Sequence, residues 1–181
     1  MSNAKIRTFE LDEGEKATAV MAYTANMLAW GEVITRESMR VSTWLRTPAA
    51  PQYLTLHDAH VRFQSATGIG RMQSFAALHL PSSQIIAFHL IPPARDPVDY
   101  EENEPHRKME PVTALVGAFR LDGLIRMSTQ TNLERYLDVA KETFTTFYEV
   151  EITQPGEAQM GTLRVPYVLL RRDSILFSPR C

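Results

Sequence analysis

The chain matches itself when its 181-residue sequence is shifted by about half its length, and this self-similarity constrains the fold more than any other feature. A shift of 92 positions places Gly31 on Gly123 and superimposes apolar residues on both sides of them. The apolar pairs at this shift are Val20 with Val112, Ala22 with Ala114, Val33 with Ile125, Val41 with Leu133, Trp44 with Tyr136, and Leu45 with Leu137. The order of glycine and apolar segments therefore recurs.

Two one-residue deletions extend this match toward the C-terminus, and both fall where loops are expected. At a shift of 91 the pairs are Thr55 with Thr146, Leu56 with Phe147, Asp58 with Glu149, Ala59 with Val150, and Val61 with Ile152. At a shift of 90 they are Leu78 with Val168, Leu80 with Leu170, Ser83 with Asp173, Ile85 with Ile175, and Ile86 with Leu176. The sequence thus predicts repeat 1 over residues 20–91, repeat 2 over residues 112–181, and an N-terminal arm over residues 1–19.

A segment of different composition separates the two predicted repeats. Residues 92–111 contain five prolines and six acidic residues among twenty. Proline lacks the backbone N–H and fixes φ, so this composition disfavours both a helix interior and a central strand. We expect an extended, solvated, acidic linker.

Each repeat shows turn and helix signals in the same order. Asp122-Gly123 lies between two β-rich runs and predicts a hairpin, whereas its counterpart Trp30-Gly31 is compatible with a turn or a bulge. A capping-box pattern then begins at Thr131 in repeat 2, and Ser38 is the matching candidate cap in repeat 1. Apolar stripes of two short helices follow, at Leu133, Tyr136, Leu137 and Ala140, and at Val41, Trp44 and Leu45 before Pro48.

Further apolar runs predict the remaining strands of each repeat. These are 53–63, 75–80 and 85–91 in repeat 1, and 144–153, 163–170 and 174–178 in repeat 2. Each repeat therefore is predicted as β-β-α-β-β-β in about 70 residues, a length that suits a small bent antiparallel sheet or half-barrel of the SH3 or Sm-like kind. The expected fold is mainly β (α+β), with two such tandem repeats packed together with pseudo-two-fold symmetry, because neither repeat has much core of its own.

Repeat 1 also resembles a known family. The residues that carry the resemblance are Gly31, then Arg40-Val-Ser-Thr-Trp-Leu, Tyr53-Leu-Thr-Leu-His-Asp-Ala59, Leu78-His-Leu and Gln84-Ile-Ile. They are similar to an uncharacterised bacterial small-β domain family of unknown function. Repeat 2 departs from the pattern, because Tyr148-Glu-Val stands where the family has an Asp-Ala type of ending. The resemblance implies the fold and implies no catalytic residue.

Composition and charge narrow the function classes. The chain has 19 basic and 21 acidic residues and a net charge of −2, which argues against binding to nucleic acid or an anionic membrane through the overall charge of the chain. The single cysteine, Cys181, excludes an intramolecular disulfide and favours a reducing, cytoplasmic location. No apolar run approaches the roughly 18 residues of a membrane helix, so we expect a soluble protein without membrane partners.

The densest cluster of ligand-type residues is His57, Asp58 and His60. On a regular strand, residues 57 and 60 would project to opposite faces, which makes these residues only weak candidates for a metal site. His79 and His89 lie in apolar runs and are interpreted as histidines satisfied within the sheet. No nucleophile, base and acid are spaced as a triad, so we expect no catalytic residues, no cofactor and no enzymatic activity.

Basic residues mark a possible binding surface. They are Arg62 and Arg71 in repeat 1 and Arg164, Arg171 and Arg172 in repeat 2. Single-stranded nucleic acid also requires exposed aromatic residues, whereas Tyr53, Tyr136 and Phe144 are predicted to face the core. We therefore expect a non-enzymatic binding or scaffolding protein. It would present strand edges or the groove between repeats to a protein partner or to itself. An Sm- or SH3-like nucleic-acid-binding protein and a small-molecule sensor, with its ligand between the repeats, are the alternatives.

Overall fold

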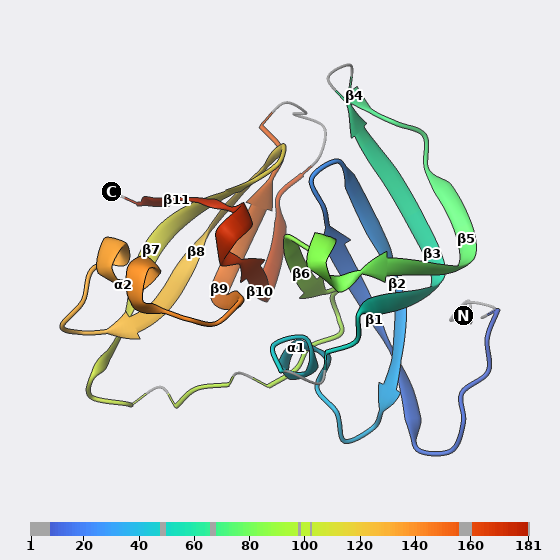
Figure 1. The fold of residues 1–181 in the computed structure, drawn as a ribbon, viewed down its shortest axis with the longest axis horizontal. Helices are drawn as coiled ribbons and strands as arrows, with labels where there is room; N and C mark the ends of the chain where they lie inside the picture. Colours follow the sequence, from blue (N-terminus) through green and yellow to red (C-terminus); the bar gives the residue numbers. More distant parts are fainter. Residues whose placement is uncertain are drawn as a thin grey trace.

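The fold consists of eleven β-strands, two short α-helices and two 3-10 turns, in a computed structural model that describes residues 8–47, 50–65, 68–97, 99–101, 103–155 and 161–180 (Figure 1). The first group of elements is β1 (Glu15–Tyr23), β2 (Met27–Arg36), α1 (Val41–Trp44), β3 (Tyr53–Ser65), β4 (Gly68–Ile69), β5 (Gln73–Pro81), η1 (Ser82–Gln84) and β6 (Ala87–Leu90). The second group is β7 (Arg107–Val116), β8 (Phe119–Ser128), α2 (Leu133–Val139), β9 (Phe144–Thr153), β10 (Leu163–Arg171), η2 (Arg172–Ser174) and β11 (Leu176–Pro179). The prediction of a mainly β chain is confirmed.

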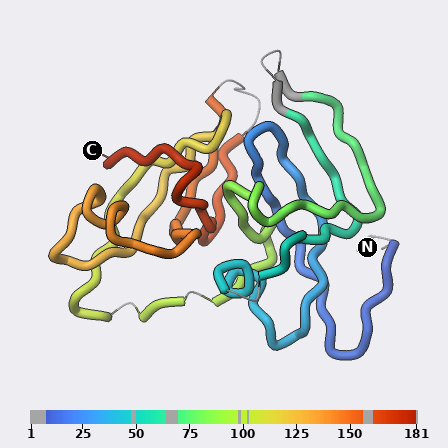
Figure 2. The backbone as a smooth tube through the Cα atoms, viewed as in Figure 1, coloured from blue at the N-terminus to red at the C-terminus, as the bar shows by residue number. Residues whose placement is uncertain are grey.

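All strand pairs are antiparallel, and they form one sheet that does not close on itself. The order is β11-β7-β8-β9-β10-β6-β1-β2-β3-β4, with β5 paired to β3. We call β1 to β6 the N-terminal half and β7 to β11 the C-terminal half. Within them the strand orders are β6-β1-β2-β3-β5 and β11-β7-β8-β9-β10. Figure 2 shows the two halves as bent units side by side, joined where β6 meets β10.

This junction determines how the halves are related. A two-fold axis that exchanged the halves would place β5 on β10 and β6 on β11. Because β10 pairs with β6, such an axis would also require β5 to pair with β11. In the described part of the chain, β5 pairs with β3 and β11 pairs with β7. The predicted pseudo-two-fold packing is therefore wrong, and the two halves are arranged head to tail.

Two hydrophobic cores lie on opposite faces of the shared sheet. Buried side chains of the N-terminal half form the N core, which also takes in Phe144, Tyr148, Tyr167 and Leu169 from the C-terminal half. Buried side chains of the C-terminal half form the C core, which also takes in Tyr23, Leu28 and Ala87 from the N-terminal half. Each half thus contributes its outward-facing side chains to the core of the other.

A repeated irregularity bends the sheet in each half. Between β2 and β3 the register shifts at Gly31, opposite Asp58, which has a φ of 46°. Between β8 and β9 it shifts at Gly123, opposite Glu149, which has a φ of 51°. These are β-bulges, which increase the local twist of a strand.

Glycine is required opposite each bulge because the two strands approach closely there. A Cβ on Gly31 would lie 2.7 Å from the carbonyl oxygen of His57, and one on Gly123 would lie 2.8 Å from that of Tyr148. The hairpin predicted at Asp122-Gly123 is therefore wrong, because this glycine provides clearance in the middle of β8. The actual hairpin is at residues 117–118, where Gly117 has a φ of 57°.

The two helices form at the positions that their apolar stripes predicted, but other residues than those predicted occupy their N-cap positions. Asn132, not Thr131, caps α2, since its side chain accepts a hydrogen bond from the backbone N–H of Arg135. Arg40 occupies the N-cap position of α1, without a side-chain hydrogen bond, in place of Ser38. Pro48, expected to end the first helix, lies outside the described residues.

Strands also extend beyond the predicted boundaries. β1 begins at Glu15, inside the predicted N-terminal arm, and β7 begins at Arg107, inside the predicted linker. Pro111 is tolerated within β7 because its carbonyl oxygen accepts a hydrogen bond from the N–H of Arg180. Its nitrogen points to the same side, away from β8, so no hydrogen bond of the β7–β8 pair is lost.

Candidate binding surfaces

The first candidate surface is the pair of open strand edges at β5 and β11. Among the described strands, β5 pairs on one side only, with β3, and β11 pairs on one side only, with β7. An unpaired strand edge exposes a row of N–H and C=O groups that can accept another strand. The sheet therefore ends in two surfaces suited to strand addition.

The backbone direction at each edge follows from the hydrogen bonds beside it. The N–H of Ser82 donates to the carbonyl oxygen of Gln52, so by alternation the backbone groups of residues 77 and 79 point away from β3. The N–H of Arg180 donates to Pro111, so the backbone groups of Phe177 point away from β7. His79 and Phe177 consequently present a donor and an acceptor at the two edges.

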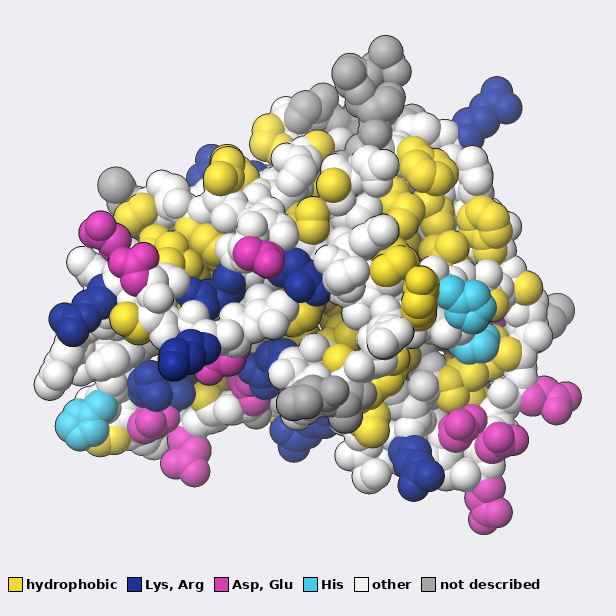
Figure 3. Space-filling model, in the orientation of Figure 1, with side chains coloured by type: hydrophobic (Ala, Val, Ile, Leu, Met, Phe, Trp, Pro, Cys, Tyr) yellow, Lys and Arg dark blue, Asp and Glu magenta, His cyan; other side chains and the backbone are white. Residues whose placement is uncertain are grey.

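Exposed apolar side chains flank these edges. Tyr53, on β3 beside β5, is 56% exposed, Leu115, on β7 beside β11, is 45% exposed, and Leu176, on β11 itself, is 71% exposed. The expectation that Tyr53 faces the core is thus wrong. Figure 3 shows hydrophobic and histidine side chains next to one another over β3 and β5. Contiguous exposed apolar side chains are typical of interaction surfaces.

The second candidate surface is the hollow between the halves, where carboxylates of the acidic linker contact both halves, although most described linker residues are exposed to solvent as expected. Asp96 accepts hydrogen bonds from the Ser42 N–H at 3.3 Å and the Ser42 hydroxyl at 2.8 Å. Asp99 pairs with Arg46 at 2.5 Å and accepts a 2.6 Å hydrogen bond from the Tyr148 hydroxyl. Asp96 thus connects α1 to Tyr167 on β10, and Asp99 connects Arg46, just after α1, to Tyr148 on β9.

These contacts shift the titration of the groups involved. Burial alone would raise the pKa of Asp99, but the Tyr148 hydroxyl and the Arg46 charge outweigh it, so the pKa lies below its ordinary value. Burial, with the neighbouring Asp99 carboxylate, raises the pKa of Tyr148. Burial also raises the pKa of Tyr167, which lies beside Asp96, to about 12. At neutral pH the Asp99 carboxylate is therefore charged, and the Tyr148 and Tyr167 hydroxyls are neutral hydrogen-bond donors.

The open hollow beside Asp99 has a volume of about 450 Å³ and a mixed lining. Its lining includes Arg46, Arg107, Arg126, Tyr100 and Tyr148. The arginines are already paired within the chain, Arg46 with Asp99, and both Arg107 and Arg126 with Glu104. A charged ligand in this hollow would have to displace these ion pairs. The backbone groups at the strand edges are unpaired within the described part of the sheet, so the edges are the better candidate binding surface.

The weak metal candidates His57, Asp58 and His60 lie together on β3 but do not converge. The bulge at Asp58 adds one residue to the strand, so His57 and His60 project from the same face, contrary to the expected opposite faces. The Asp58 carboxylate accepts hydrogen bonds from Thr8, and His60 Nδ1 lies 2.9 Å from the Ser74 hydroxyl. Within the described ranges, no three His, Cys, Asp or Glu side chains are grouped as a metal site would require.

The two other strand histidines have different surroundings. His79 is exposed, with Nδ1 3.0 Å from the Thr55 hydroxyl. His89 is completely buried: its Nδ1–H donates to the carbonyl oxygen of Leu90 at 2.9 Å, and its Nε2 lies 3.1 Å from the Tyr23 hydroxyl. Burial lowers the pKa of His89 to about 4, so the ring is neutral at physiological pH. This neutral ring accepts the Tyr23 hydrogen bond inside the sheet.

The five predicted surface arginines occupy separate places. Arg171 donates to the carbonyl oxygens of Ile85 at 2.7 Å and Ser82 at 2.6 Å, and it lies 4.7 Å from the centre of the Phe144 ring. Arg172 donates to the carbonyl oxygens of Leu137, in the last turn of α2, and of Ala140, its C-cap residue. These two side chains therefore hold the junction and the helix in place. Arg62 and Arg71 are exposed in the N-terminal half, and exposed Arg164 pairs with Glu151 at 2.6 Å.

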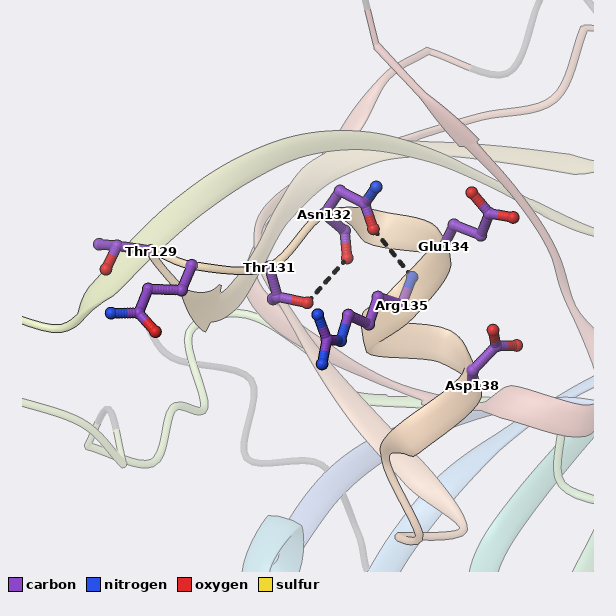
Figure 4. A pocket seen from close by; sticks show the side chains of 7 residues that line it. Thr129, Thr131, Asn132, Glu134, Arg135 and Asp138 are labelled. Atoms are coloured by element: carbon purple, nitrogen blue, oxygen red, sulfur yellow. Dashed lines mark hydrogen bonds between the residues drawn. The ribbon is translucent and has the colours of Figure 1, made fainter.

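Another hollow lies at the start of α2 (Figure 4). Thr131, Asn132, Arg135 and Asp138 are among its lining residues, and Asn132 already caps the helix. The helix has only seven residues, and the picture shows the side chains of Arg135 and Asp138 spread over an open surface. We assign no function to it.

No family model, no curated protein and no solved structure matches this chain. In the portion that the structure describes, neither helix has the length and apolar character needed to span a membrane. The candidate surfaces therefore rest on the geometry of the chain itself. Sequence reasoning expected binding through strand edges but did not identify β5 and β11 as the edge strands, although Pro81 and Pro179, at their ends, are a signal typical of edge strands.

Proposed function

We propose that the chain is a tandem repeat of small bent β units of the SH3 or Sm-like kind. Several equivalences support this proposal. The Gly-bulge pairs Gly31 with Asp58 and Gly123 with Glu149 recur at the alignment shifts of 92 and 91. The hydrogen bond from Ser82 to Gln52 recurs as that from Arg172 to Thr143. The resemblance of repeat 1 to an uncharacterised bacterial small-β domain family belongs to the same proposal.

The strand register supports one refinement of the alignment. Ala22 lies opposite Phe88, and its counterpart Ala114 lies opposite Phe177. This pairing requires a shift of 89 in the last strand, one residue beyond the shift that the sequence suggested. Phe88 then corresponds to Phe177, and Ala87 to Leu176. A third one-residue deletion, just before the last strand, accounts for the difference.

We further propose that the protein is a non-enzymatic binding protein, acting in the cytoplasm, that adds strands of a protein partner to its open edges. The observation that carries this proposal is the coincidence of unpaired backbone at β5 and β11 with exposed Tyr53, Leu115 and Leu176. In strand addition the backbone supplies the affinity, and the alternate side chains supply the specificity. A scaffold whose sheet is open at both ends can engage two partners.

The test uses immobilised eight-residue peptides, capped at both ends, that alternate apolar and polar residues. We expect a subset to bind the wild-type protein, and we expect Tyr53→Lys and Leu176→Lys each to weaken binding at its own edge. Phe63→Lys is the matched control, because Phe63 is 43% exposed at the other end of β3 from Tyr53, beyond the residues that pair with β5. If no peptide binds, or if all three variants bind alike, the proposal is wrong.

A second candidate function is binding of single-stranded nucleic acid to the outer face of β3. The observation that favours it is the exposure of Tyr53 on the face of β3 that also carries exposed Arg62, because base stacking combined with cationic side chains is typical of such sites. A labelled oligonucleotide should then bind with a steep salt dependence, more weakly to the variant Tyr53→Ala or Arg62→Gln than to the control Arg164→Gln. No binding at low salt would exclude it.

A further inference from the structure

The junction between β10 and β6 is an assembly contact that occurs inside one chain. Leu169 lies opposite Phe88, and Leu170 lies opposite Ala87. Around these pairs, each half inserts outward-facing side chains into the core of the other, so that Phe144 is 6% exposed and Tyr23 is 2% exposed. The contact joins two different edges, so it leaves one edge of each half unused.

The unused edges carry the counterparts of the junction residues. Tyr53 occupies the register position of Phe144, since Tyr53 lies opposite Pro81 as Phe144 lies opposite Arg171. By the same alignment Leu115 corresponds to Tyr23, and Leu176 to Ala87. The junction residues are buried, whereas their counterparts Tyr53, Leu115 and Leu176 are among the most exposed large apolar side chains that the structure describes.

We propose that a second copy of this chain pairs its β11 with β5 of the first copy, in the register of the internal junction. His79 then lies opposite Phe177, and Leu80 lies opposite Leu176. The inference rests on the proposed function, strand addition at open edges, and names the partner as the chain itself.

The geometry of both edges fits this pairing. The N–H and C=O groups of His79 and Phe177 point outward, so two antiparallel strands exchange both hydrogen bonds at this pair. Leu176 then contacts the N core of the first copy near Leu80, in the way that Ala87 contacts the C core near Leu170. Tyr53 contacts the C core of the second copy, as Phe144 contacts the N core within one chain.

This contact between chains is weaker than the internal junction for two reasons. Pro81 in β5 occupies the position that corresponds to Arg171 in β10. The Arg171 side chain donates hydrogen bonds to the carbonyl oxygens of Ile85 and Ser82 across the internal junction, whereas Pro81 has neither a backbone N–H nor a side-chain donor. In addition, the internal contact benefits from the covalent connection between the halves, which raises the effective concentration. We therefore expect reversible association that depends on concentration.

The arrangement also determines the type of assembly. A head-to-tail contact leaves a free β5 on one end and a free β11 on the other, so further copies can add until a ring closes or a filament forms. Edge strands of this kind favour repeated addition unless their ends are blocked. Pro81 and Pro179 lack N–H groups and confine the pairing to the segment between them.

Sedimentation velocity tests the proposal on a Cys181→Ser background, which excludes disulfide-linked dimers. Over a range from about 1 µM to about 1 mM, which spans weak affinities, we expect the average mass to rise above the 20.5 kDa of one chain. Tyr53→Lys blocks the β5 edge and Leu176→Lys blocks the β11 edge, so each variant alone should remain monomeric. An equal mixture should form dimers, because each variant retains the edge that the other lacks. Phe63→Lys, at the other end of β3 from Tyr53, should associate like the parent protein.

A gain-of-function variant provides the complementary test. Pro81→Arg restores the donor that the internal junction uses, and we expect it to tighten association several-fold. Hydrogen exchange of the parent protein is a readout independent of any variant. The amides of His79 and Phe177 should exchange more slowly as the protein concentration rises, whereas that of Phe63, at the far end of β3, should not change.

Each outcome decides between specific alternatives. A parent protein that stays monomeric over the whole range, with unchanged exchange at His79 and Phe177, overturns the inference. If edge-specific peptides still bind that monomer, strand addition stands and only the partner is wrong. Association of either edge variant alone, or a mixture that does not dimerise, excludes the head-to-tail register. Should a variant fail to fold by circular dichroism, the exchange measurement on the parent protein decides.

Discussion

The buried His89 makes the stability of the protein depend on pH in a way that can be calculated. The folded state holds this imidazole with a pKa of about 4, against an ordinary value of 6.5 for an exposed histidine in the unfolded chain. Between these two values the unfolded state binds the proton more readily. Stability is therefore full above about pH 6.5 and falls as the pH decreases toward 4. The difference of 2.5 pH units corresponds to about 3 kcal/mol, at 1.36 kcal/mol for each unit.

The assay is urea denaturation at a series of pH values between 7 and 4, with wild-type protein and the variant His89→Gln. The glutamine side chain retains an acceptor for the Tyr23 hydroxyl but does not titrate. Other groups titrate in both proteins, so the difference between the two curves isolates His89. We expect that difference to change by about 3 kcal/mol across the range.

The variant Tyr23→Phe is the matched control for this experiment. It removes the hydroxyl 3.1 Å from Nε2 but leaves His89 buried. It should lower stability by about 1 kcal/mol at every pH, the usual cost of one hydrogen bond, and keep the pH dependence. If the wild-type and His89→Gln curves stay parallel from pH 7 to 4, burial does not control this histidine and the reasoning is refuted.

Three further predictions concern stability. Gly123→Ala should destabilise the fold by about 1–3 kcal/mol in thermal denaturation through overpacking, whereas Gly161→Ala, with open space around it, should have no measurable effect. Arg171→Ala should cost about 2 kcal/mol because it leaves two carbonyl oxygens at the junction without their charged donor, while Arg164→Ala, on an exposed ion pair, should cost less than about 0.5 kcal/mol. Asp99→Asn should release the docked linker and accelerate its cleavage in limited proteolysis; an unchanged rate would show that this carboxylate does not hold the linker.

The strands, the helices and their order were predictable because they depend on local apolar periodicity. The apolar stripe ending at Leu45 and the paired runs around Thr55 and Thr146 occur where helix and strand were expected. The bulge glycines were recognised as equivalent, but their role was not predicted. An Asp-Gly pair indicates a turn when glycine needs a positive φ, and at Gly123 it instead provides clearance for the Tyr148 carbonyl.

The surfaces were less predictable because they depend on contacts between distant segments. Whether Tyr53 is buried or exposed depends on which strand lies next to β5, and no local pattern contains that information. The docked linker likewise depends on Ser42, Arg46 and Tyr148, which come from three different elements. The prolines and acids of the linker predicted its extended backbone but not its anchoring side chains.

The shared sheet at β6 has a consequence for how this chain tolerates change. All four residues of β6 are buried, with Phe88 and Leu90 in one core and Ala87 in the other. A substitution at one position alters the packing volume in one interior directly and shifts the backbone that supports the other. We therefore expect compensating substitutions for β6 to arise in both halves of the chain, and we expect the two halves to lose their structure in a single cooperative transition.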